Sequence, residues 1–383
     1  MRLAVITCYN QPNYIRTKSL LAALRCIDAV EVIDIRNRRI GLLRYPEVFL
    51  KILRARINQR PDAYLLAFRG YEMLLPVRLL TLGKPLAYDE FINPIEWVVK
   101  EKRQVEAKQT SAALYRTLVA MMSRIIVAVV ASRLFKWIYR RMVQSTGIVL
   151  TDTNSHADIS AELTGARRSI FLDVPVGADE SVIEKQGERV ENDVFTVIYY
   201  GSMLPLHGLQ YVIDAAVKMN HDNVKFVVIG GNAKVAHDVA YAVGNGANID
   251  YKAWVEFDQL PKLIEQADLC LAGPFGNTFQ ARYVITGKAY QYLAMGKPTI
   301  IGINEESHIF TDKKDALLIP QADSDALVDA IRWAIDHPTE LDKIGTAGKS
   351  LYENELSVAV IAGRLKEMLL KLGLTEPATG NQK

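Results

Sequence analysis

Residues 269–303 constrain the fold of this chain more than any other stretch. They begin with an apolar run of strand length at 269–272, which is followed by a loop rich in Gly, Pro, Asn and Thr. A helix-compatible segment then covers 286–295, Gly296 stops it, and the β-branched run 299–303 follows. Strand, loop, helix, glycine and strand in this order predict one unit of a parallel α/β fold.

Lys288 is the first candidate functional residue in this unit. It lies in the first turn of the predicted helix, where free backbone N–H groups and the helix dipole disfavour a cation. A bound anion, such as a diphosphate held by N–H groups and one ammonium, would resolve the conflict. A solvated lysine on a surface helix fits the same residues, so the pattern alone leaves both interpretations open.

The block ITGKAYQYLAMGKPTIIG at 285–302 resembles the donor-site segment of the GT-B glycosyltransferases of family 4, also called group 1. In that family a helix bearing Lys or Glu ends in a small residue, Met, Gly, any residue and Pro. The resemblance extends in order over nearly the whole chain. It implies an α/β fold of two Rossmann-like domains that face each other across a cleft. It also implies sugar transfer from a nucleotide-diphosphate sugar, with retention of configuration and without a metal or other cofactor.

The length suits this architecture, because 383 residues, half of them hydrophobic, can build two α/β cores. The resemblance predicts an acceptor- and membrane-facing domain at 1–176 and a nucleotide-sugar-binding domain at 177–356. A helix at 357–373 is expected to pack back toward the first domain, and 374–383 to be a disordered tail. The three cysteines lack metal-ligand spacing, which favours a reducing, cytoplasmic setting.

Charge is divided unevenly along the chain. The first 150 residues hold 25 Lys and Arg against 11 Asp and Glu, a net +14, whereas the remainder holds 21 against 32, a net −11. The basic part predicts an anionic partner. No helix-turn-helix, RNA-recognition or zinc-finger pattern accompanies it, so nucleic acid is not expected. An anionic membrane surface or a phosphate-bearing lipid fits better.

Two segments of the basic part are candidates for contact with a membrane. Residues 36–60 alternate bulky apolar residues with Arg and Lys at helical spacing, and residues 118–137 have an apolar centre interrupted by Arg124 and Arg133. Each predicts either an interfacial membrane element or a helix packed within the domain. Neither offers an uninterrupted apolar span of about 20 residues, which disfavours a transmembrane helix. We expect a peripheral protein on the inner face of the cytoplasmic membrane.

Three polar residues of the first domain lie near predicted strand ends. Arg16 follows the first strand, where it could contact a donor phosphate or an acceptor, or lie on the surface. Asp89 ends a strand that begins with Lys-Pro; the resemblance places such a residue near the transferred sugar, so Asp89 is the candidate for sugar contact or acid/base work. Capping the next segment is its alternative role. His156 is expected on the surface, in the first turn of a helix capped by Asp152 or Thr153.

In the second domain, the block GSMLPLHGLQYVIDAA at 201–216 resembles the first diphosphate loop of the family. Many members carry Arg after the first glycine and Lys before the second, where this chain has Ser202 and His207. Donor binding is therefore expected to weaken once His207 becomes neutral above a pKa near 6.5. The complete set of implied donor-binding residues is Gly201, Ser202, His207, Gly208, Arg282, Lys288 and Gln291.

Gln291 marks a second departure from the family, because it stands in place of the later Glu of a Glu-x7-Glu pair. The earlier position holds Tyr283. Gln291 can still hydrogen-bond ribose hydroxyls, but neither position supplies a carboxylate. Trp254 is either a neighbour of the nucleotide base or a core residue.

The predicted function is transfer of a sugar to a cell-envelope glycan or lipid-linked acceptor. The alternative is a non-catalytic module that binds a nucleotide sugar or a partner through a degenerate site. An epimerase of the same fold would need several acidic and His residues around the sugar, which the sequence does not show. A purely structural membrane protein would not need Lys288 or the paired glycines.

Overall fold

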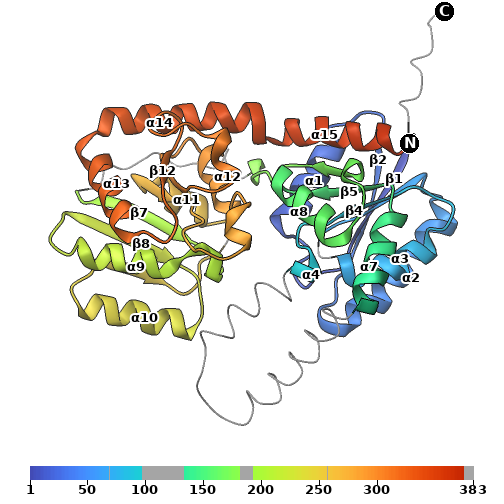
Figure 1. Cartoon of the computed structure of the whole chain (residues 1–383), viewed down its shortest axis with the longest axis horizontal. Helices are drawn as coiled ribbons and strands as arrows, with labels where there is room; N and C mark the ends of the chain where they lie inside the picture. Colours follow the sequence, from blue (N-terminus) through green and yellow to red (C-terminus); the bar gives the residue numbers. More distant parts are fainter. Residues whose placement is uncertain (69, 97–132, 182–192, 257, 375–383) are drawn as a thin grey trace, which may run out of the picture. The chain divides into compact units, whose positions relative to one another are not determined.

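The chain forms two compact units in a computed structural model that describes residues 1–68, 70–96, 133–181, 193–256 and 258–374. Unit 1 combines Met1–Val176 with Val358–Lys383, and unit 2 is Gly177–Ser357. Each unit contains a six-stranded parallel sheet with flanking helices (Figure 1). The prediction of two Rossmann-like α/β domains is confirmed.

The sheet of unit 1 has the order β2-β1-β3-β4-β5-β6, and every neighbouring pair is parallel. Its strands are β1 (Arg2–Thr7), β2 (Glu31–Arg36), β3 (Ala63–Leu66), β4 (Leu86–Asp89), β5 (Ile148–Thr151) and β6 (Phe171–Asp173). Its described α-helices are α1 (Ile15–Arg25), α2 (Arg44–Asn58), α3 (Leu74–Leu80), α4 (Pro94–Glu96), α7 (Arg133–Ser145), α8 (Asn154–Thr164) and α15 (Val358–Lys371).

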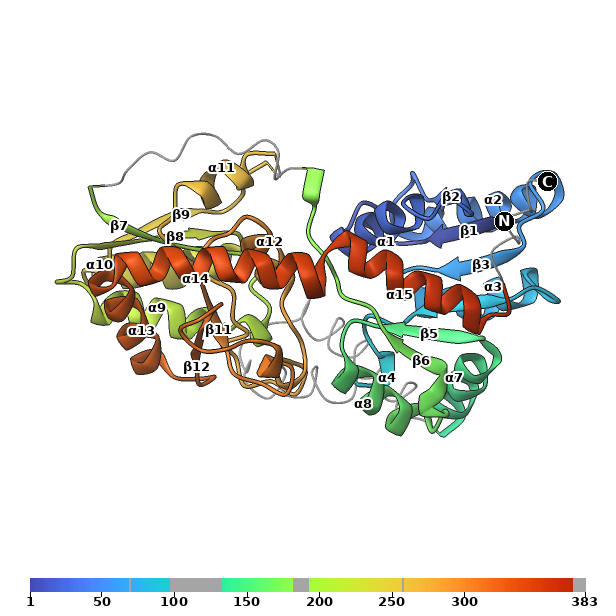
Figure 2. The ribbon, with the colours of Figure 1, turned by 90° about the horizontal axis from the view of Figure 1, so that it is seen from above.

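Both faces of this sheet are covered by helices. Leu3 and Val5 of β1 pack in one core together with residues of α1 and α15, while Ala4 and Ile6 pack in another with residues of α2, α3, α7 and α8. Strands buried on both faces need apolar residues at consecutive positions, which explains the unbroken apolar run of β1. The last helix, α15, lies alongside α1 (Figure 2).

The sheet of unit 2 has the order β12-β11-β10-β7-β8-β9 and is also parallel. Its strands are β7 (Phe195–Tyr200), β8 (Val224–Ile229), β9 (Ile249–Lys252), β10 (Leu269–Leu271), β11 (Thr299–Gly302) and β12 (Leu317–Ile319). Its described α-helices are α9 (Leu209–Lys218), α10 (Ala233–Gly244), α11 (Leu260–Glu265), α12 (Gly287–Ala294), α13 (Ser324–Asp336) and α14 (Pro338–Leu351). A π-helical turn, Tyr352–Leu356, follows α14.

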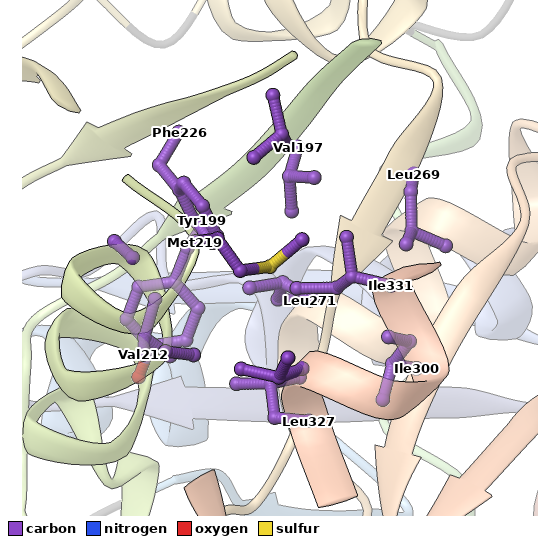
Figure 3. Packing of buried hydrophobic residues seen from close by; sticks show 14 of the residues in the cluster. Val197, Tyr199, Val212, Met219, Phe226, Leu269, Leu271, Ile300, Leu327 and Ile331 are labelled. Carbon is purple, nitrogen blue, oxygen red and sulfur yellow. The ribbon is translucent and has the colours of Figure 1, made fainter. Parts of the chain in front are cut away.

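One core of unit 2 joins the middle of the sheet to α9 and α13 (Figure 3). Val197 and Leu271 come from adjacent strands, and Leu327 and Ile331 lie one turn apart on α13. All four side chains are fully buried, and each such burial stabilises the fold by roughly 1.5–3 kcal/mol. This packing holds β7 and β10 in place, and the loops of the candidate site begin at the ends of these two strands.

The structure bears on the predicted membrane segments, the predicted tail and Trp254. No helix in the described part of the chain is long and apolar enough to cross a membrane. Residues 118–132 of the second membrane candidate lie outside the described residues, and only its end, from Arg133, is seen in α7. The predicted disordered tail also lies outside the described residues from residue 375 onward.

Trp254 is 76% exposed, so its assignment to the core was wrong. It follows a short strand that ends at Lys252.

Candidate functional site

A glycine-flanked loop leaves the carboxyl end of β7 and begins α9. It contains a 3₁₀ turn, Pro205–His207, and Gly208 then adopts a left-handed conformation with φ of 68° as the first residue before α9. A Cβ at Gly208 would come within 2.4 Å of the Gly276 nitrogen, so no larger residue fits there without a backbone shift. The loop is thus held against residues 275–276. No side chain in the described part of the structure caps the N-terminus of α9.

Lys288 is the second residue of α12, whose start is tied to the sheet. The hydroxyl of Thr286, the residue before this helix, donates to the carbonyl oxygen of Ala272 at 2.9 Å. The Lys288 side chain is only 4% exposed, so the interpretation as a solvated surface lysine was wrong. Its Nζ lies 4.7 Å from the centroid of the Tyr199 ring and has no hydrogen-bond partner among the described residues. Burial lowers the pKa of Lys288 from 10.5 to about 7.

Gly201, His207 and Lys288 meet at one point, although they come from different parts of the sequence. A Cβ placed on Gly201 would lie 3.5 Å from His207 Nδ1 and 4.0 Å from Lys288 Nζ. His207 Nδ1 is buried and, within the described part of the chain, lacks a hydrogen-bond partner. Buried polar atoms without partners are rare in folded proteins and call for an explanation. Two such nitrogens side by side indicate a site that awaits an acceptor, above all an anion.

The imidazole of His207 does not titrate where the sequence predicted. Burial lowers its pKa well below 6.5, and the positive charge of Lys288 lowers it further. His207 is therefore neutral near pH 7, where it offers one donor and one acceptor nitrogen. Its carbonyl oxygen accepts a hydrogen bond from the Tyr199 hydroxyl at 2.8 Å, which fixes the turn. Neutralisation of His207 is therefore not expected near pH 6.5, and in this site Lys288 has a pKa near neutrality.

Gln291 lies less than one turn beyond Lys288 on α12. It is 7% exposed, and its Oε1 accepts a hydrogen bond from the Asp179 backbone N–H at 3.3 Å. Its Nε2 is buried without a partner in the described residues, so it remains available as a donor. Tyr283, at the earlier position of the Glu-x7-Glu pair, is also buried. Neither position supplies a carboxylate, because Gln291 carries an amide and Tyr283 a phenol.

The two remaining donor-binding candidates have different surroundings. Arg282 is exposed, pairs with Glu305 at 2.8 Å, and places its guanidinium 5.4 Å from the centroid of the Phe279 ring. No contact seen among the described residues connects it with Lys288 or His207. Ser202 is exposed on the glycine-flanked loop. The structure thus brings Gly201, His207 and Lys288 together, and it leaves Arg282 in a surface ion pair.

In unit 1, Arg16 and Asp89 form a buried ion pair. Arg16 Nη2 lies 2.9 Å from Asp89 Oδ1, and Nε donates to both carboxylate oxygens. Arg16 Nη1 donates to the carbonyl oxygens of Val174 and Pro175. Both side chains are fully buried. The assignment of Arg16 to the surface was wrong, and its bonds leave it unsuited to binding a phosphate. Asp89 is fully buried and its carboxylate is paired with Arg16, an arrangement that does not support the expected acid/base role or sugar contact.

A second polar cluster follows β4 and β5, and it was not predicted from the sequence. Glu90 is fully buried and accepts hydrogen bonds from the Tyr139 hydroxyl at 2.5 Å and from Asn93 Nδ2 at 3.0 Å. Burial raises the pKa of Glu90. These groups belong to distant segments, so local sequence could not pair them. The cluster connects β4 with α7.

His156 is buried beside this cluster, although the sequence favoured a surface position. Thr153 caps α8 as predicted, because its hydroxyl oxygen accepts from the His156 N–H. His156 Nδ1 lies 2.6 Å from Asp152 Oδ1. Burial alone would lower the pKa of His156, but the Asp152 carboxylate, with Glu90 and Glu96, raises it above 6.5 overall. The four-residue spacing of Asp152 and His156 was the available signal.

Residues 181–351 match the family model described as "Glycosyl transferases group 1". The match covers fewer than half of the 383 residues, and over these residues the chain is similar to group 1 glycosyltransferases. The matched region contains both the glycine-flanked loop and α12, so it includes the residues that meet around Lys288. The match supports glycosyltransferase activity for the chain. Comparison with the curated proteins finds no match.

Solved structures with the same fold include several glycosyltransferases. A structure of Alr3699/HepE from Anabaena in complex with UDP and glucose has a TM-score of 0.67 at 12% identity, over 97% of this chain and 99% of that one. Sucrose-phosphate synthase from Thermosynechococcus elongatus has a TM-score of 0.70 at 12% identity, with the same coverage. A glycosyltransferase from Rickettsia africae has 0.64 at 10%, over 97% and 98%. At these identities the likeness shows the fold, which is the GT-B fold.

Proposed function

We propose that this chain transfers a sugar from a nucleotide-diphosphate sugar to a cell-envelope glycan or lipid-linked acceptor. The observation that carries the proposal is the buried Lys288 ammonium, which lies beside His207 Nδ1 and Gly201 without a hydrogen-bond partner in the described structure. A diphosphate supplies the negative charge and the acceptor oxygens that this arrangement needs. The HepE structures contain UDP or UDP-glucose, which makes uridine the first nucleotide to test.

In the proposed reaction, the bond between the anomeric carbon and the diphosphate oxygen breaks while the acceptor hydroxyl oxygen bonds to that carbon. Negative charge grows on the departing diphosphate, which takes up the hydroxyl proton. The Lys288 ammonium would stabilise this charge in a site with little water. Neutral His207 would donate one hydrogen bond, as would the uncapped N–H groups that begin α9 and α12. Because Lys288 supplies the fixed positive charge, we propose that neither a metal nor another cofactor is required.

We further propose that the chain is a family 4 variant in which Gln291 replaces the second Glu of the Glu-x7-Glu pair and the reaction retains configuration. The buried Gln291 Nε2, free of a partner in the described residues, supports a contact with a ribose hydroxyl. Ser202, on the same loop as His207, is proposed as a further phosphate contact. Arg282 would have to leave Glu305 before it could contribute to donor binding.

The second candidate function is a module that binds a nucleotide sugar without turnover. One observation favours it: Asp89 is enclosed by Arg16, while Tyr283 and Gln291 supply no carboxylate. A catalytic chain would therefore depend on stabilisation of the leaving group, without a side-chain base at these three positions. Binding measurements do not separate the two candidates, but turnover does.

The experiment that tests the proposal is incubation of the full chain with UDP, GDP, ADP and TDP sugars, followed by proton NMR. We expect release of one nucleoside diphosphate at a rate above the spontaneous reaction, and a first-formed sugar product with the donor's anomeric configuration. Inverted product would contradict retention. Binding of a nucleotide sugar with no hydrolysis or transfer, even with candidate lipid-linked acceptors, would favour the module.

Donor affinity is expected to depend on pH through Lys288. Its pKa is lowered to about 7, and binding of the diphosphate favours the protonated form. His207 stays neutral over the same range because its pKa lies well below 6.5. The dissociation constant for UDP-glucose should rise by about twofold from pH 6 to 7 and then toward about tenfold per pH unit. Titration calorimetry in two buffers should detect proton uptake at pH 8, and an affinity unchanged from pH 6 to 9 would contradict this.

We also propose that the acceptor is met at the inner face of the cytoplasmic membrane. The support is the strongly basic first part of the chain, with a net charge of +14 over 150 residues. Basic surfaces attract anionic lipids by about 1 kcal/mol per cation near the bilayer. This setting predicts peripheral attachment.

A further inference from the structure

The outward side of α2 carries apolar residues at helical spacing. Leu43, just before the helix, Leu50 and Ile57 are seven residues apart and 58%, 54% and 70% exposed. Seven residues are almost two turns, so the three side chains form one stripe. The buried residues of α2 (Val48, Ile52 and Ala55) lie on the opposite side and pack in the core of unit 1. An amphipathic helix is expected to have a polar outer side, and α2 instead has a second apolar stripe.

The neighbouring helices repeat this arrangement. On and just after α3, exposed Leu75, Leu79 and Leu82 follow one another at spacings of four and three, opposite the buried Leu74 and Val77. On α7, Leu134 and Trp137 are exposed, whereas Tyr139 and Val143 are buried.

Helix α3 contacts both α2 and α7 (Figure 1). All three helices bury their inner sides in one core, so the three stripes lie on the same outer side of unit 1. We name this surface the apolar-basic face, and it consists of Ile40, Leu42, Leu43, Leu50, Ile57, Leu75, Leu79, Leu82, Leu134 and Trp137 with the cations around them.

Positive charge surrounds these apolar residues. Residues 36–60, 70–84 and 133–145 together hold fourteen Lys and Arg but only two acidic residues, Glu47 and Glu72. Each of the two is already in an ion pair, Glu47 with Lys51 at 2.6 Å and Glu72 with Arg44 at 2.8 Å. Arg36 is paired with Asp34 at 2.6 Å, but cations still far outnumber acidic residues in these three segments, so their net charge is positive. The Arg141 guanidinium lies 5.9 Å from the centroid of the Trp137 ring, so charge and apolar surface occur together.

We propose that the apolar-basic face docks unit 1 on an anionic lipid bilayer, with the leucine stripes and Trp137 entering the headgroup boundary and the arginines contacting lipid phosphates. Apolar residues backed by Lys and Arg are the pattern of interfacial helices. A second copy of this chain is a poorer occupant, because a twofold interface would place two surfaces of the same net positive charge against one another. The inference rests on the membrane setting of the proposed function and names the surface that provides it.

The test is co-sedimentation of the full chain with vesicles of phosphatidylcholine, alone or mixed with phosphatidylglycerol. We expect binding only to the anionic vesicles, reduced by salt. The triple variant Leu50→Ser/Ile57→Ser/Leu79→Ser should bind at least about tenfold more weakly, since each leucine or isoleucine loses apolar burial. Arg54→Ala and Lys136→Ala should each weaken binding about fivefold. Leu370→Ser is the matched control, because Leu370 is an exposed leucine of unit 1 on α15, outside the face.

Three outcomes would overturn the proposal. The first is no sedimentation of the wild type with anionic vesicles, and the second is equal vesicle binding by the triple variant and Leu370→Ser. The third is a dimer in solution that the triple variant abolishes, while the wild type does not bind vesicles. Failure of the donor site is distinguishable, because UDP-glucose binding is measured without lipid. We expect the triple variant to bind UDP-glucose as the wild type does. A triple variant that lost both vesicle binding and UDP-glucose binding would be unfolded. The single variants Arg54→Ala and Lys136→Ala would then test the proposal. Fivefold weaker vesicle binding would support it, and unchanged vesicle binding would overturn it.

Discussion

Replacement of Lys288 by methionine is expected to lower kcat/KM for the sugar donor by about 100- to 1000-fold. The reason is the loss of the only positive charge that the structure places beside Gly201 and His207 among the described residues. Removal of one donor that stabilises developing charge in a preorganised site costs about this much. The measurement is initial-rate kinetics with the nucleotide sugar that the wild type turns over. Lys262→Met, on the exposed surface of α11, is the control and should retain wild-type kinetics.

The same variant is expected to be more stable than the wild type without ligand. Lys288 has a pKa of about 7 in the folded protein and 10.5 when unfolded, so its charge opposes folding. The unfolded chain binds more protons between about pH 7 and 10.5, and wild-type stability should rise with pH across that window. Lys288→Met removes both the cost and this slope. A variant with lower activity and a lower melting temperature at pH 7 would instead indicate a structural role for Lys288.

Replacement of Arg16 by methionine should destabilise unit 1 by about 3–5 kcal/mol, because it leaves the Asp89 carboxylate buried without its partner. The full chain can be unfolded in urea and followed through its first transition. The double variant Arg16→Met/Asp89→Leu should recover most of the loss, since no charge is then left unpaired. An equal loss in the single and double variants would show that the bonds from Arg16 to the Val174 and Pro175 carbonyls dominate.

A surface ion pair of unit 1 provides the comparison for Arg16. Lys371 and Glu367 on α15 lie 2.8 Å apart, and both side chains are about 40% exposed. Lys371→Met should change the free energy of unfolding by no more than about 0.5 kcal/mol, as is usual for exposed helix pairs. If Arg16→Met changed the free energy of unfolding equally little, the buried pair would not be a stabilising feature of the fold. The assignment of Asp89 to a structural ion pair would then lose support.

The fold was predictable because its signals are local. Strand β11 and helix α12 lie within the predicted ranges 299–303 and 286–295, because an apolar run marks the strand and Gly296 marks the end of the helix. Lys288 was found in the first helical turn for the same reason. Burial of charge was not predictable, because it depends on partners from distant segments. Arg16 and Asp89 are 73 residues apart in the sequence, and no residue next to either of them indicates that they form an ion pair.

The apolar-basic face shows the same limit. The sequence identified residues 36–60 as amphipathic, and α2 lies within that segment. The short helix α3 gave no separate signal, although Leu75, Leu79 and Leu82 form a stripe there. Only the structure places α3 between α2 and α7. Sequence periodicity reports one helix at a time, whereas a docking surface depends on which helices are neighbours.

The most direct test of the central claim is titration calorimetry of UDP-glucose, GDP-glucose, ADP-glucose and TDP-glucose at pH 7 with the wild type and Lys288→Met. We predict that one of these donors binds the wild type with a micromolar-range dissociation constant. The variant should stay folded and bind the same donor at least about 100-fold more weakly. Equal affinity in the two proteins would contradict a diphosphate site at Lys288, and so would the absence of binding by every donor to the wild type.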